Sequence, residues 1–328
     1  MQSRPDDEAP PRSVLITGAG GYIGTQLVAA LAREPRPIVR VVATDIRAPA
    51  PARTLAGIEY IELDIRSAGL ARVLKDRSVE AVVHLASVVT PGPRLSRRTQ
   101  YEIDVLGTKN VLECCVAAHV SNVIVTSSGA AYGYHADNPQ PLEEHDDLRG
   151  NEAFAYSHHK RQVEMLLARY RHEHPELRQL VLRLCTVLGA AVSNQIVSLF
   201  EKPIIVGIRG AEAPFVFVSD KDVVACLCEG ICRRREGIYN VAGDGTMTMA
   251  EIAAHAGKPH VAIPAGLLRF ALAVLHPLGL SGYGPEQVDF LRYRPVLSNA
   301  KLKREFGFVP TRTSCEAFAE YWSSRAHD

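Results

Sequence analysis

A short apolar run that leads directly into a glycine-rich turn constrains this chain more than any other stretch. The run is Val14–Thr17, and glycine follows it at positions 18, 21 and 24. Beyond the turn, apolar residues recur at helical spacing over Thr25–Arg33. We therefore predict a strand, a tight turn and a helix in immediate succession, an arrangement that binds phosphate groups in many α/β proteins.

Each of the three glycines has a separate physical use in such a turn. Gly18 allows a tight exit from the strand, Gly21 lets a pyrophosphate approach the backbone, and Gly24 lets the helix pack close to the sheet. Backbone N–H groups and the positive end of the helix would face the phosphates, beside Tyr22 and Ile23. A structural turn without a ligand is the alternative, but the order of strand, turn and helix favours a nucleotide site.

Strands and helices alternate through the first half of the chain. Besides the first strand, we predict strands at four short apolar runs, which are Ile38–Thr44, Ile58–Leu63, Val79–Leu85 and Asn122–Thr126. Tyr101–Val120 has helical periodicity. This alternation is typical of an α/β fold with a Rossmann-type doubly wound parallel sheet, whose strand ends meet at one edge.

The residues at these strand ends predict the cofactor. Asp45 can accept hydrogen bonds from both ribose hydroxyls and would repel a 2′-phosphate, which favours NAD over NADP. Arg47 keeps NADP open, because a guanidinium could bind that phosphate. Further along the edge, an acid and an apolar residue can meet the adenine, and small residues let a dinucleotide cross the sheet. The predicted cofactor-binding residues are Gly18, Gly21, Tyr22, Ile23, Gly24, Asp45, Ile46, Arg47, Asp64, Ile65, Leu85, Ala86 and Ser87.

Tyr156 and Lys160 lie four residues apart at the start of a predicted helix, so they share one face of it. A nearby ammonium stabilises a phenolate, which makes Tyr156 usable as a general acid or base. Ser128, at the end of a predicted strand, could hydrogen-bond the same substrate oxygen. His84 also ends a strand, and we interpret it as a core histidine without an acid–base role.

Together these residues resemble the extended short-chain dehydrogenase/reductases and, within them, the NAD-dependent epimerase/dehydratase family, of the UDP-glucose 4-epimerase kind. The resemblance covers nearly the whole chain. It rests on ordered motifs, which are Thr17–Gly24, Asp64–Ile65, His84–Ala86, Val105–Thr108, Ser127–Gly133, Tyr156–Lys160, Phe217–Asp220 and Tyr239–Gly243. It implies a catalytic set in which Ser128 orients the substrate, Tyr156 transfers a proton and Lys160 holds the nicotinamide ribose.

The resemblance also implies a division of the chain into a larger and a smaller part. We expect a flexible leader over residues 1–12, an NAD-binding Rossmann domain over 13–185, and a mainly substrate-binding C-terminal lobe over 186–328. Later segments should return to the sheet, so the boundary is approximate. Family members often dimerise through the two long helices, here Tyr101–Val120 and Tyr156–Tyr170, so we expect a homodimer.

One departure from the family pattern concerns the substrate. Sugar-nucleotide epimerases usually carry an arginine that binds the substrate diphosphate where this chain has Ala213 and Pro214. Arg209, Arg292 or Arg294 could replace that cation, although a solvated surface charge is the alternative for each. The residues predicted to bind substrate are Ser128, Gly129, Arg209 and Arg292.

Other departures lie close to the catalytic motif. Asp104 replaces the usual asparagine before Val-x-Gly-Thr, and His158 and His159 replace the small residues common inside the tyrosine motif. We expect a solvated helix position for these two histidines in preference to a place in the active site. Val88 and Val89 stand where epimerases of the galactose type tend to have lysine, which weakens that subtype.

Composition limits the partners and the compartment. The 328 residues carry a formal net charge of +1 with acids and bases interspersed, so we expect neither a nucleic-acid nor a membrane partner. The seven cysteines lie in apolar runs apart from Cys315, which predicts buried thiols and no metal. Prolines and charges interrupt the longest apolar stretch, Val261–Leu280, so we expect a packed helix under a pocket. Met1–Arg12 does not resemble a signal peptide, so we expect a cytoplasmic protein.

The sequence leaves more than one function open. We expect an NAD-dependent sugar epimerase or dehydratase, most simply one acting on a nucleotide-linked sugar, in which Tyr156 removes a hydroxyl proton as NAD accepts hydride. The alternative is a net dehydrogenase or ketone reductase on a sugar acid or hydroxysteroid-like alcohol, which the apolar segment Val261–Leu280 and the absent arginine favour. A redox-sensing protein that binds NAD without turnover has little support, because Ser128, Tyr156 and Lys160 are all present.

Overall fold

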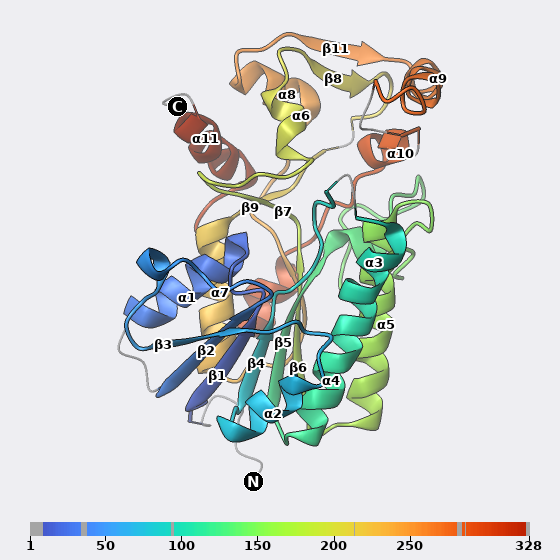
Figure 1. Cartoon of the computed structure of the whole chain (residues 1–328). Coiled ribbons are helices and arrows are strands. Elements are labelled where there is room, and N and C mark those ends of the chain that lie inside the picture. The colour runs from blue at the N-terminus through green and yellow to red at the C-terminus, as the bar shows by residue number, and fades with distance from the viewer. Residues whose placement is uncertain are drawn as a thin grey trace.

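Seven parallel strands form the central sheet of the protein. The computed structural model describes residues 9–33, 38–92, 95–212, 214–280, 284–285 and 287–325, so Ala213 and residues 1–8 of the expected leader lie outside the described residues. The strand order is β10-β6-β5-β4-β1-β2-β3 (Figure 1). The strands are β1 (Ser13–Thr17), β2 (Arg40–Asp45), β3 (Ile58–Glu62), β4 (Ala81–His84), β5 (Asn122–Ser128), β6 (Arg178–Leu184) and β10 (Gly237–Val241). The predicted Rossmann-type sheet is confirmed.

Helices cover both faces of this sheet, and each face has its own apolar core. On one face lie α1 (Tyr22–Arg33) and α7 (Asp220–Cys232), packed against each other and against the sheet (Figure 1). The other face carries α2 (Gly69–Asp76), α4 (Gly107–Ala117) and α5 (Ala155–Glu173). Thr17 pairs with both Thr44 and His84, so the carboxyl ends of β1, β2 and β4 meet at one edge.

A smaller lobe sits above that edge (Figure 1). It has a third apolar core rich in phenylalanine, formed around Phe200, Phe215, Phe217 and Phe318. Two short parallel pairs belong to this part, β7 with β9 and β8 with β11. Its elements are β7 (Thr186–Leu188), α6 (Val197–Glu201), β8 (Ile205–Ile208), β9 (Phe217–Ser219), α8 (Met249–His255), β11 (His260–Ile263), α9 (Ala265–Leu275), α10 (Gln287–Arg292) and α11 (Ser314–Arg325).

One sequence expectation is confirmed and one needs correction. The helix expected over Tyr101–Val120 is present as a continuous run of helical backbone, which consists of α3 (Arg97–Tyr101), a π-helical turn η3 (Glu102–Leu106) and α4. The apolar segment expected to be a packed helix forms α9, but none of its residues is buried. Apolar composition alone could not show which side of that helix the lobe covers.

The chain crosses between the two parts more than once. After β6 it enters the lobe, returns to the sheet through α7 and β10, and returns again through η5 (Leu302–Phe306), which packs beside β10. Phe306 is fully buried in the core that α1 and α7 share. The expected boundary near residue 185 stays a prediction, and the expected return of later segments to the sheet agrees with this path.

A buried ion pair fastens the long helix α5 to the sheet. Arg183 on β6 donates from Nε and Nη2 to the two carboxylate oxygens of Glu164 at 2.9 and 3.1 Å, and both side chains are almost wholly buried. Its Nη1 donates to the Tyr132 hydroxyl at 2.7 Å, and that hydroxyl donates to Asn240 of β10. Burial opposes the charge on Arg183, but the Glu164 carboxylate outweighs it and raises the pKa of the guanidinium. The network thereby joins α5, β6 and β10.

Replacing Glu164 by alanine should strongly destabilise the protein, because Arg183 would keep a buried charge without a partner. We expect a loss of about 3–5 kcal/mol in the free energy of unfolding, measured by urea denaturation. Glu173→Ala is the matched control on the same helix, since its half-exposed pair with Arg169 at 3.7 Å should contribute less than about 1 kcal/mol. Equal losses in the two variants would show that the buried pair has no special role.

Two glycine-to-alanine changes should alter stability in opposite directions. A Cβ on Gly24 would lie 2.2 Å from the Gly18 carbonyl oxygen, which the packing of α1 cannot allow, whereas a Cβ on Gly266 of α9 would meet nothing within 4 Å. We expect Gly24→Ala to lower the melting temperature and Gly266→Ala to stabilise by up to about 1 kcal/mol through helix propensity. A melting temperature unchanged in Gly24→Ala would contradict the close approach.

Candidate active site

The carboxyl ends of the central strands open into a cavity of about 470 Å³ between the sheet and the smaller lobe. Gly18 has a φ of +67°, and a Cβ there would lie 2.6 Å from the backbone nitrogen of Ala86, so the turn after β1 passes directly against the end of β4. Only glycine fits both this conformation and this contact. The first predicted glycine therefore has the role that the sequence assigns to it, a tight exit from the strand.

One end of the cavity is the glycine turn. Gly18, Gly21 and Gly24 line it, together with Tyr22 and Ile23, at the point where α1 begins. The backbone N–H of Gly20 donates to the Asp45 carboxylate at 2.9 Å, which fixes that acid beside the turn. A helix N-terminus and backbone without side chains form a cradle that suits the phosphates and ribose of a dinucleotide. The residues present thus fit the predicted cofactor.

The other predicted cofactor residues lie at varying distances from this end. Leu85 and Ser87 line the cavity, and the Ala86 backbone touches the turn. Ile46 and Arg47 are exposed beyond Asp45.

The pair predicted to meet the adenine is held by contacts within the protein. The Asp64 carboxylate is bound by Arg66, whose side-chain nitrogens donate to it at 2.6–3.1 Å, and this hydrogen bonding holds the pKa of Asp64 below its usual range. Ile65 is buried against Gly107. Neither residue is among those that line the cavity, and their contact with adenine stays a prediction.

The three predicted catalytic residues all line the same cavity. Lys160 lies with its ammonium 5.6 Å from the centre of the Tyr156 ring and donates to the Thr126 carbonyl at 3.2 Å. The Ser128 hydroxyl accepts from the backbone N–H of Ala130 at 3.2 Å and so has its proton available to donate. The arrangement can bind a hydroxyl or carbonyl group of a substrate and move a proton to or from it.

A serine holds the first turn of α5, and with it Tyr156, against the end of β5. The Ser157 hydroxyl donates to the Ala130 carbonyl at 2.6 Å and accepts from the Asn151 N–H at 3.0 Å. Ala130 belongs to the short helical turn η4 (Gly129–Tyr132), which directly follows Ser128. The serine after the tyrosine therefore places Ser128 and Tyr156 relative to each other.

One expectation about the histidines is wrong. His159 is not solvated: its side chain is buried, with Nδ1 3.5 Å from the Asp104 carboxylate. The other Asp104 oxygen accepts from the Ser87 hydroxyl at 3.0 Å and from the Val88 N–H at 2.8 Å. The two departures from the family pattern, Asp104 and His159, thus lie close together next to Lys160. The face of α5 that meets the segment around Asp104 could not be read from one helix alone.

His84 is a core residue, as the sequence analysis expects. Its ring bridges the hydroxyls of Thr17 at 2.8 Å and Thr108 at 2.9 Å. The Thr108 hydroxyl donates to the Asp104 carbonyl, so it accepts from Nε2 of His84. Burial, with a smaller effect from Lys160, lowers the pKa of His84 to about 3, so the ring is neutral.

Arg294 is the cation that reaches the substrate end of the cavity. Its guanidinium is wedged between the rings of Phe215 and Phe290, 3.9 and 4.4 Å from their centres. Nη2 donates to the Thr186 hydroxyl at 3.1 Å, and Nε and Nη1 have no hydrogen-bond partner among the described residues. Burial lowers the pKa of Arg294 to about 10, so it remains charged at neutral pH.

The two arginines predicted to bind substrate lie elsewhere. Arg209 is exposed on the turn after β8, and Arg292 stacks on Tyr293, 4.9 Å from its ring centre. Neither is among the residues that line the cavity, whereas Gly129 is. Their roles stay predictions. The sequence analysis considered Arg294 as a replacement cation without selecting it, because spacing in this irregular segment does not show which arginine points inward.

The rest of the substrate end is mostly apolar. The smaller lobe contributes most of this surface, and Asn194 and Gln195 add amides. The apolar lining residues beyond β6 are Val187, Val192, Ile196, Leu199, Val206, Val216, Leu268, Leu272, Phe290, Leu291 and Leu297.

The described residues contain neither a cluster of metal ligands nor a membrane-spanning helix. No three His, Cys, Asp or Glu side chains gather there as metal ligands would. No helix in the same part of the chain is long and apolar enough to cross a membrane.

Comparison with known proteins identifies relatives of this chain. Residues 14–228 match the family model described as NAD dependent epimerase/dehydratase family. Uncharacterized protein Rv0501 of Mycobacterium tuberculosis is 26% identical over 96% of this chain and 84% of its own length. UDP-glucose 4-epimerase of Azospirillum brasilense is 30% identical over 56% of this chain and 52% of its own length.

Solved structures share the fold over nearly the whole chain. MoeE5 in complex with UDP-glucose and NAD superposes with a TM-score of 0.73 at 24% identity, over 96% of this chain and 100% of that one. UDP-glucose 4-epimerase of Thermus thermophilus, in complex with NAD, has a TM-score of 0.73 at 24% identity, over 95% and 98% of the two chains. With a glycine turn that fits NAD and a family match over more than half of its length, the chain belongs to the NAD-dependent epimerase/dehydratase family of extended short-chain dehydrogenase/reductases.

Proposed function

We propose that this protein is an NAD-dependent epimerase or dehydratase of a nucleotide-linked sugar and that Ser128, Tyr156 and Lys160 carry the chemistry. One observation carries the proposal: a single cavity is lined by the glycine turn, by these three residues and by Arg294. A cofactor, a proton-transfer group and a charged substrate can therefore meet in one place. The UDP-sugar epimerases among the relatives support a substrate of this class.

Each residue has a step that follows from its position. When bound, NAD accepts hydride from the carbinol carbon and can return it. Ser128 donates a hydrogen bond to the substrate oxygen, and Tyr156 removes the hydroxyl proton as that carbon is oxidised. Lys160, held by the Thr126 carbonyl, places a positive charge 5.6 Å from the centre of the Tyr156 ring and would hold the nicotinamide ribose. In an epimerase, Tyr156 would return the proton after the ketone has turned in the site.

Arg294 indicates what else the substrate must carry. Two of its nitrogens have no partner among the described residues. A buried cation without an anionic partner costs free energy, and an anionic group on a ligand would remove that cost. A sugar diphosphate supplies such a group, and a guanidinium is well suited to it. We therefore assign Arg294 the role of the family's absent arginine near Ala213.

A second function has its own support. The apolar lining of the substrate end, from Val192 through Leu297, suits a non-nucleotide alcohol with an apolar body as well as it suits a sugar. A net dehydrogenase acting on a sugar acid or hydroxysteroid-like compound with one anionic group would satisfy Arg294 equally. The two functions differ in their products, because net oxidation accumulates NADH and epimerisation does not.

The deciding experiment is a binding and turnover screen with the NAD-loaded protein. UDP-, dTDP-, GDP- and CDP-sugars are compared with free sugars, sugar acids and sterols by thermal shift, and each ligand that binds is incubated and its products are separated. We expect stabilisation by a nucleotide sugar and formation of its epimer or dehydrated product. Steady NADH formation from an acid or a sterol, without nucleotide binding, would establish the second function instead.

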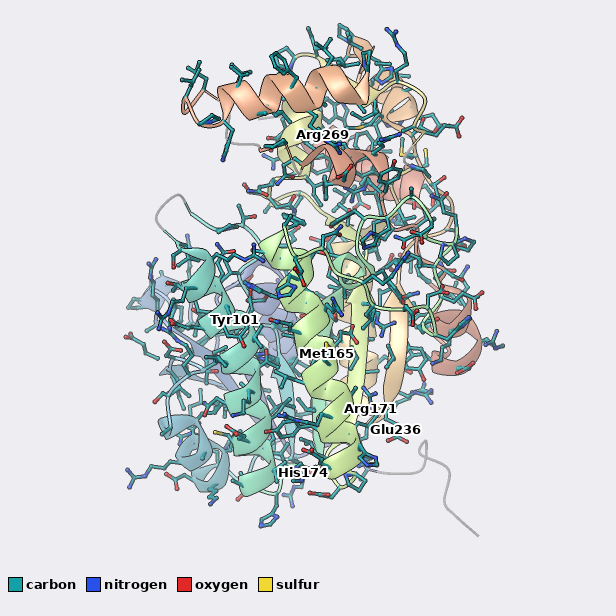
Figure 2. All side chains as sticks on the ribbon, turned by 90° about the vertical axis from the view of Figure 1, so that its right-hand side faces the viewer. Tyr101, Met165, Arg171, His174, Glu236 and Arg269 are labelled. Carbon is teal, nitrogen blue, oxygen red and sulfur yellow. The ribbon has the colours of Figure 1, made fainter. Side chains whose placement is uncertain are left out.

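We also propose that the protein works as a homodimer in the cytoplasm. The helices α4 and α5 lie side by side on the face turned to the viewer in Figure 2, and Met165 of α5 is 58% exposed there. An exposed apolar side chain between two long helices suits contact with the same helices of a second copy. Light scattering after size exclusion would measure the mass.

Replacing Tyr156 by phenylalanine should lower kcat about a hundredfold or more, because the proton-transfer group is lost while the ring remains. Tyr170→Phe, on the same helix but not in the cavity lining, is the matched control and should keep wild-type kcat. Turnover is measured with the substrate found in the screen. A wild-type rate in Tyr156→Phe would exclude its catalytic role.

Replacing Arg294 by methionine should weaken substrate binding and leave NAD binding unchanged. We expect a rise in the substrate Kd of roughly 10- to 100-fold, the scale of hydrogen bonds to a charged group. The melting temperature without substrate should stay equal or rise, because a buried charge without an anionic partner is removed. Arg292→Met is the control and should bind like the wild type. A lower melting temperature with unchanged Kd would show that Arg294 is structural.

A further inference from the structure

Helix α9 is almost entirely apolar and yet lies on the surface. Its sequence contains one charged residue, Arg269, and no acid occurs from Pro264 to Leu280. None of its residues is buried. The large apolar side chains of the helix and the turn that follows it are exposed to 60% at Leu267, 68% at Phe270, 65% at Leu278 and 72% at Leu280. Soluble monomers seldom expose a continuous apolar surface of this kind without a function for it.

The helix has two apolar sides with different surroundings. Leu268 and Leu272, four residues apart, face inward and line the substrate end of the cavity. Leu267, Phe270 and Val274 follow the spacing i, i+3, i+7 and form an outward stripe on the opposite side. The inward side explains why the helix is apolar toward the protein. Packing against the described part of the chain does not explain the outward stripe.

The position of α9 narrows the choice of partner. In Figure 2 the helix lies across the top end of the molecule, beyond the upper ends of the long helices and on the same side of the molecule as α4 and α5. Since the helix lies across one pole, a flat surface can meet the whole stripe without touching the central sheet domain (Figures 1 and 2).

The chemistry of the surface favours lipid over protein. Protein interfaces usually carry a hydrogen bond for every 100–200 Å² or so, but the three side chains of the outward stripe are all apolar. Arg269 is paired with Asp289 at 2.7 Å. Arg209 lies at the start of the helix, where its N–H donates to the Ile263 carbonyl at 2.9 Å, and His276 follows the other end. Arg209, exposed at one end of an acid-free apolar helix, is complementary to an anionic membrane surface.

We propose that the outward stripe of α9 and the turn after it dock on the surface of an anionic lipid bilayer. The helix lies in the plane of the interface and does not cross the membrane. Because Leu268 and Leu272 belong to the same helix, docking brings the substrate cavity within one helix diameter, roughly 10 Å, of the lipid. The proposal departs from the expectation that the chain has no membrane partner, and it does not depend on which alcohol is oxidised.

The test is vesicle flotation with the full-length, NAD-loaded protein. Vesicles of phosphatidylcholine with phosphatidylglycerol are compared with vesicles of phosphatidylcholine alone. We expect the wild type to float with the mixed vesicles and less with the neutral ones. The triple variant Leu267→Gln, Phe270→Gln, Val274→Gln should bind the mixed vesicles roughly tenfold less or weaker still. The triple variant Val39→Gln, Leu55→Gln, Val309→Gln removes exposed apolar side chains elsewhere and should float like the wild type.

Every outcome decides the proposal. A wild type that stays below both kinds of vesicle overturns it, as does equal flotation of the two triple variants. If α9 instead holds a second copy, light scattering without lipid will show a larger species that the α9 variant alone reduces. NAD affinity verifies that each variant is folded, and the single change Phe270→Gln replaces the triple variant if that check fails. Turnover is measured separately, so failure of the proposed reaction does not affect this result.

Discussion

The buried pair between Arg183 and Glu164 holds α5, the helix that bears Tyr156 and Lys160, against the sheet. An ion pair that is removed from water must satisfy its own hydrogen bonds, so its partners cannot shift independently. Here one guanidinium holds Glu164 of α5 and the Tyr132 hydroxyl, and Tyr132 in turn holds Asn240 at the edge of the sheet. Glu164 lies one turn after Lys160, so the pair fixes the helix face that bears Tyr156 and Lys160.

A second buried network fixes the floor of the site from the opposite side. Hydrogen bonds join Thr17 of β1 to His84, His84 to Thr108, and Thr108 to the Asp104 carbonyl. The Asp104 carboxylate accepts from the Val88 N–H in the segment after β4. Each member lies on a different element of the Rossmann domain or next to one. The neutral state of His84 lets it join two hydroxyls without adding charge beneath Lys160. Together the two networks fix the strand ends and α5 relative to each other. The smaller lobe adds Arg294 and the apolar lining of the cavity.

The sequence predicts the parts of this protein that depend on local chemistry. A glycine that must pass within contact of Ala86, or a tyrosine and lysine one turn apart, leaves a short signal that single positions can reveal. The order of strands and helices was equally predictable from periodicity. The strand bounds differ from the expected ones by a few residues, because hydrogen bonding to a neighbouring strand and not composition sets where a strand ends.

The features of the site that could not be predicted depend on contacts between distant segments of the chain. His159 is buried with its Nδ1 3.5 Å from the Asp104 carboxylate, and neither position alone reveals the other. Arg292 and Arg294 are two positions apart in the sequence, yet of these two arginines only Arg294 lines the cavity. The backbone path of that segment determines which side chain points inward. The exposure of α9 contradicts the ordinary link between hydrophobicity and burial, which is why composition suggested a packed helix.

The path of strand β10 has a consequence for how this protein can be divided. It pairs with β6 at the edge of the central sheet, although the chain reaches it only after passing through β7, α6, β8, β9 and α7. A fragment ending near residue 185 would lose this strand and α7 together, leaving an open strand edge and only α1 to cover that face of the sheet. A recombination event at residue 185 would therefore not exchange the smaller lobe alone, because it would also replace β10 and α7 of the central sheet. Substitutions and loop insertions within the intact chain can change the lining of the cavity without disturbing this sheet.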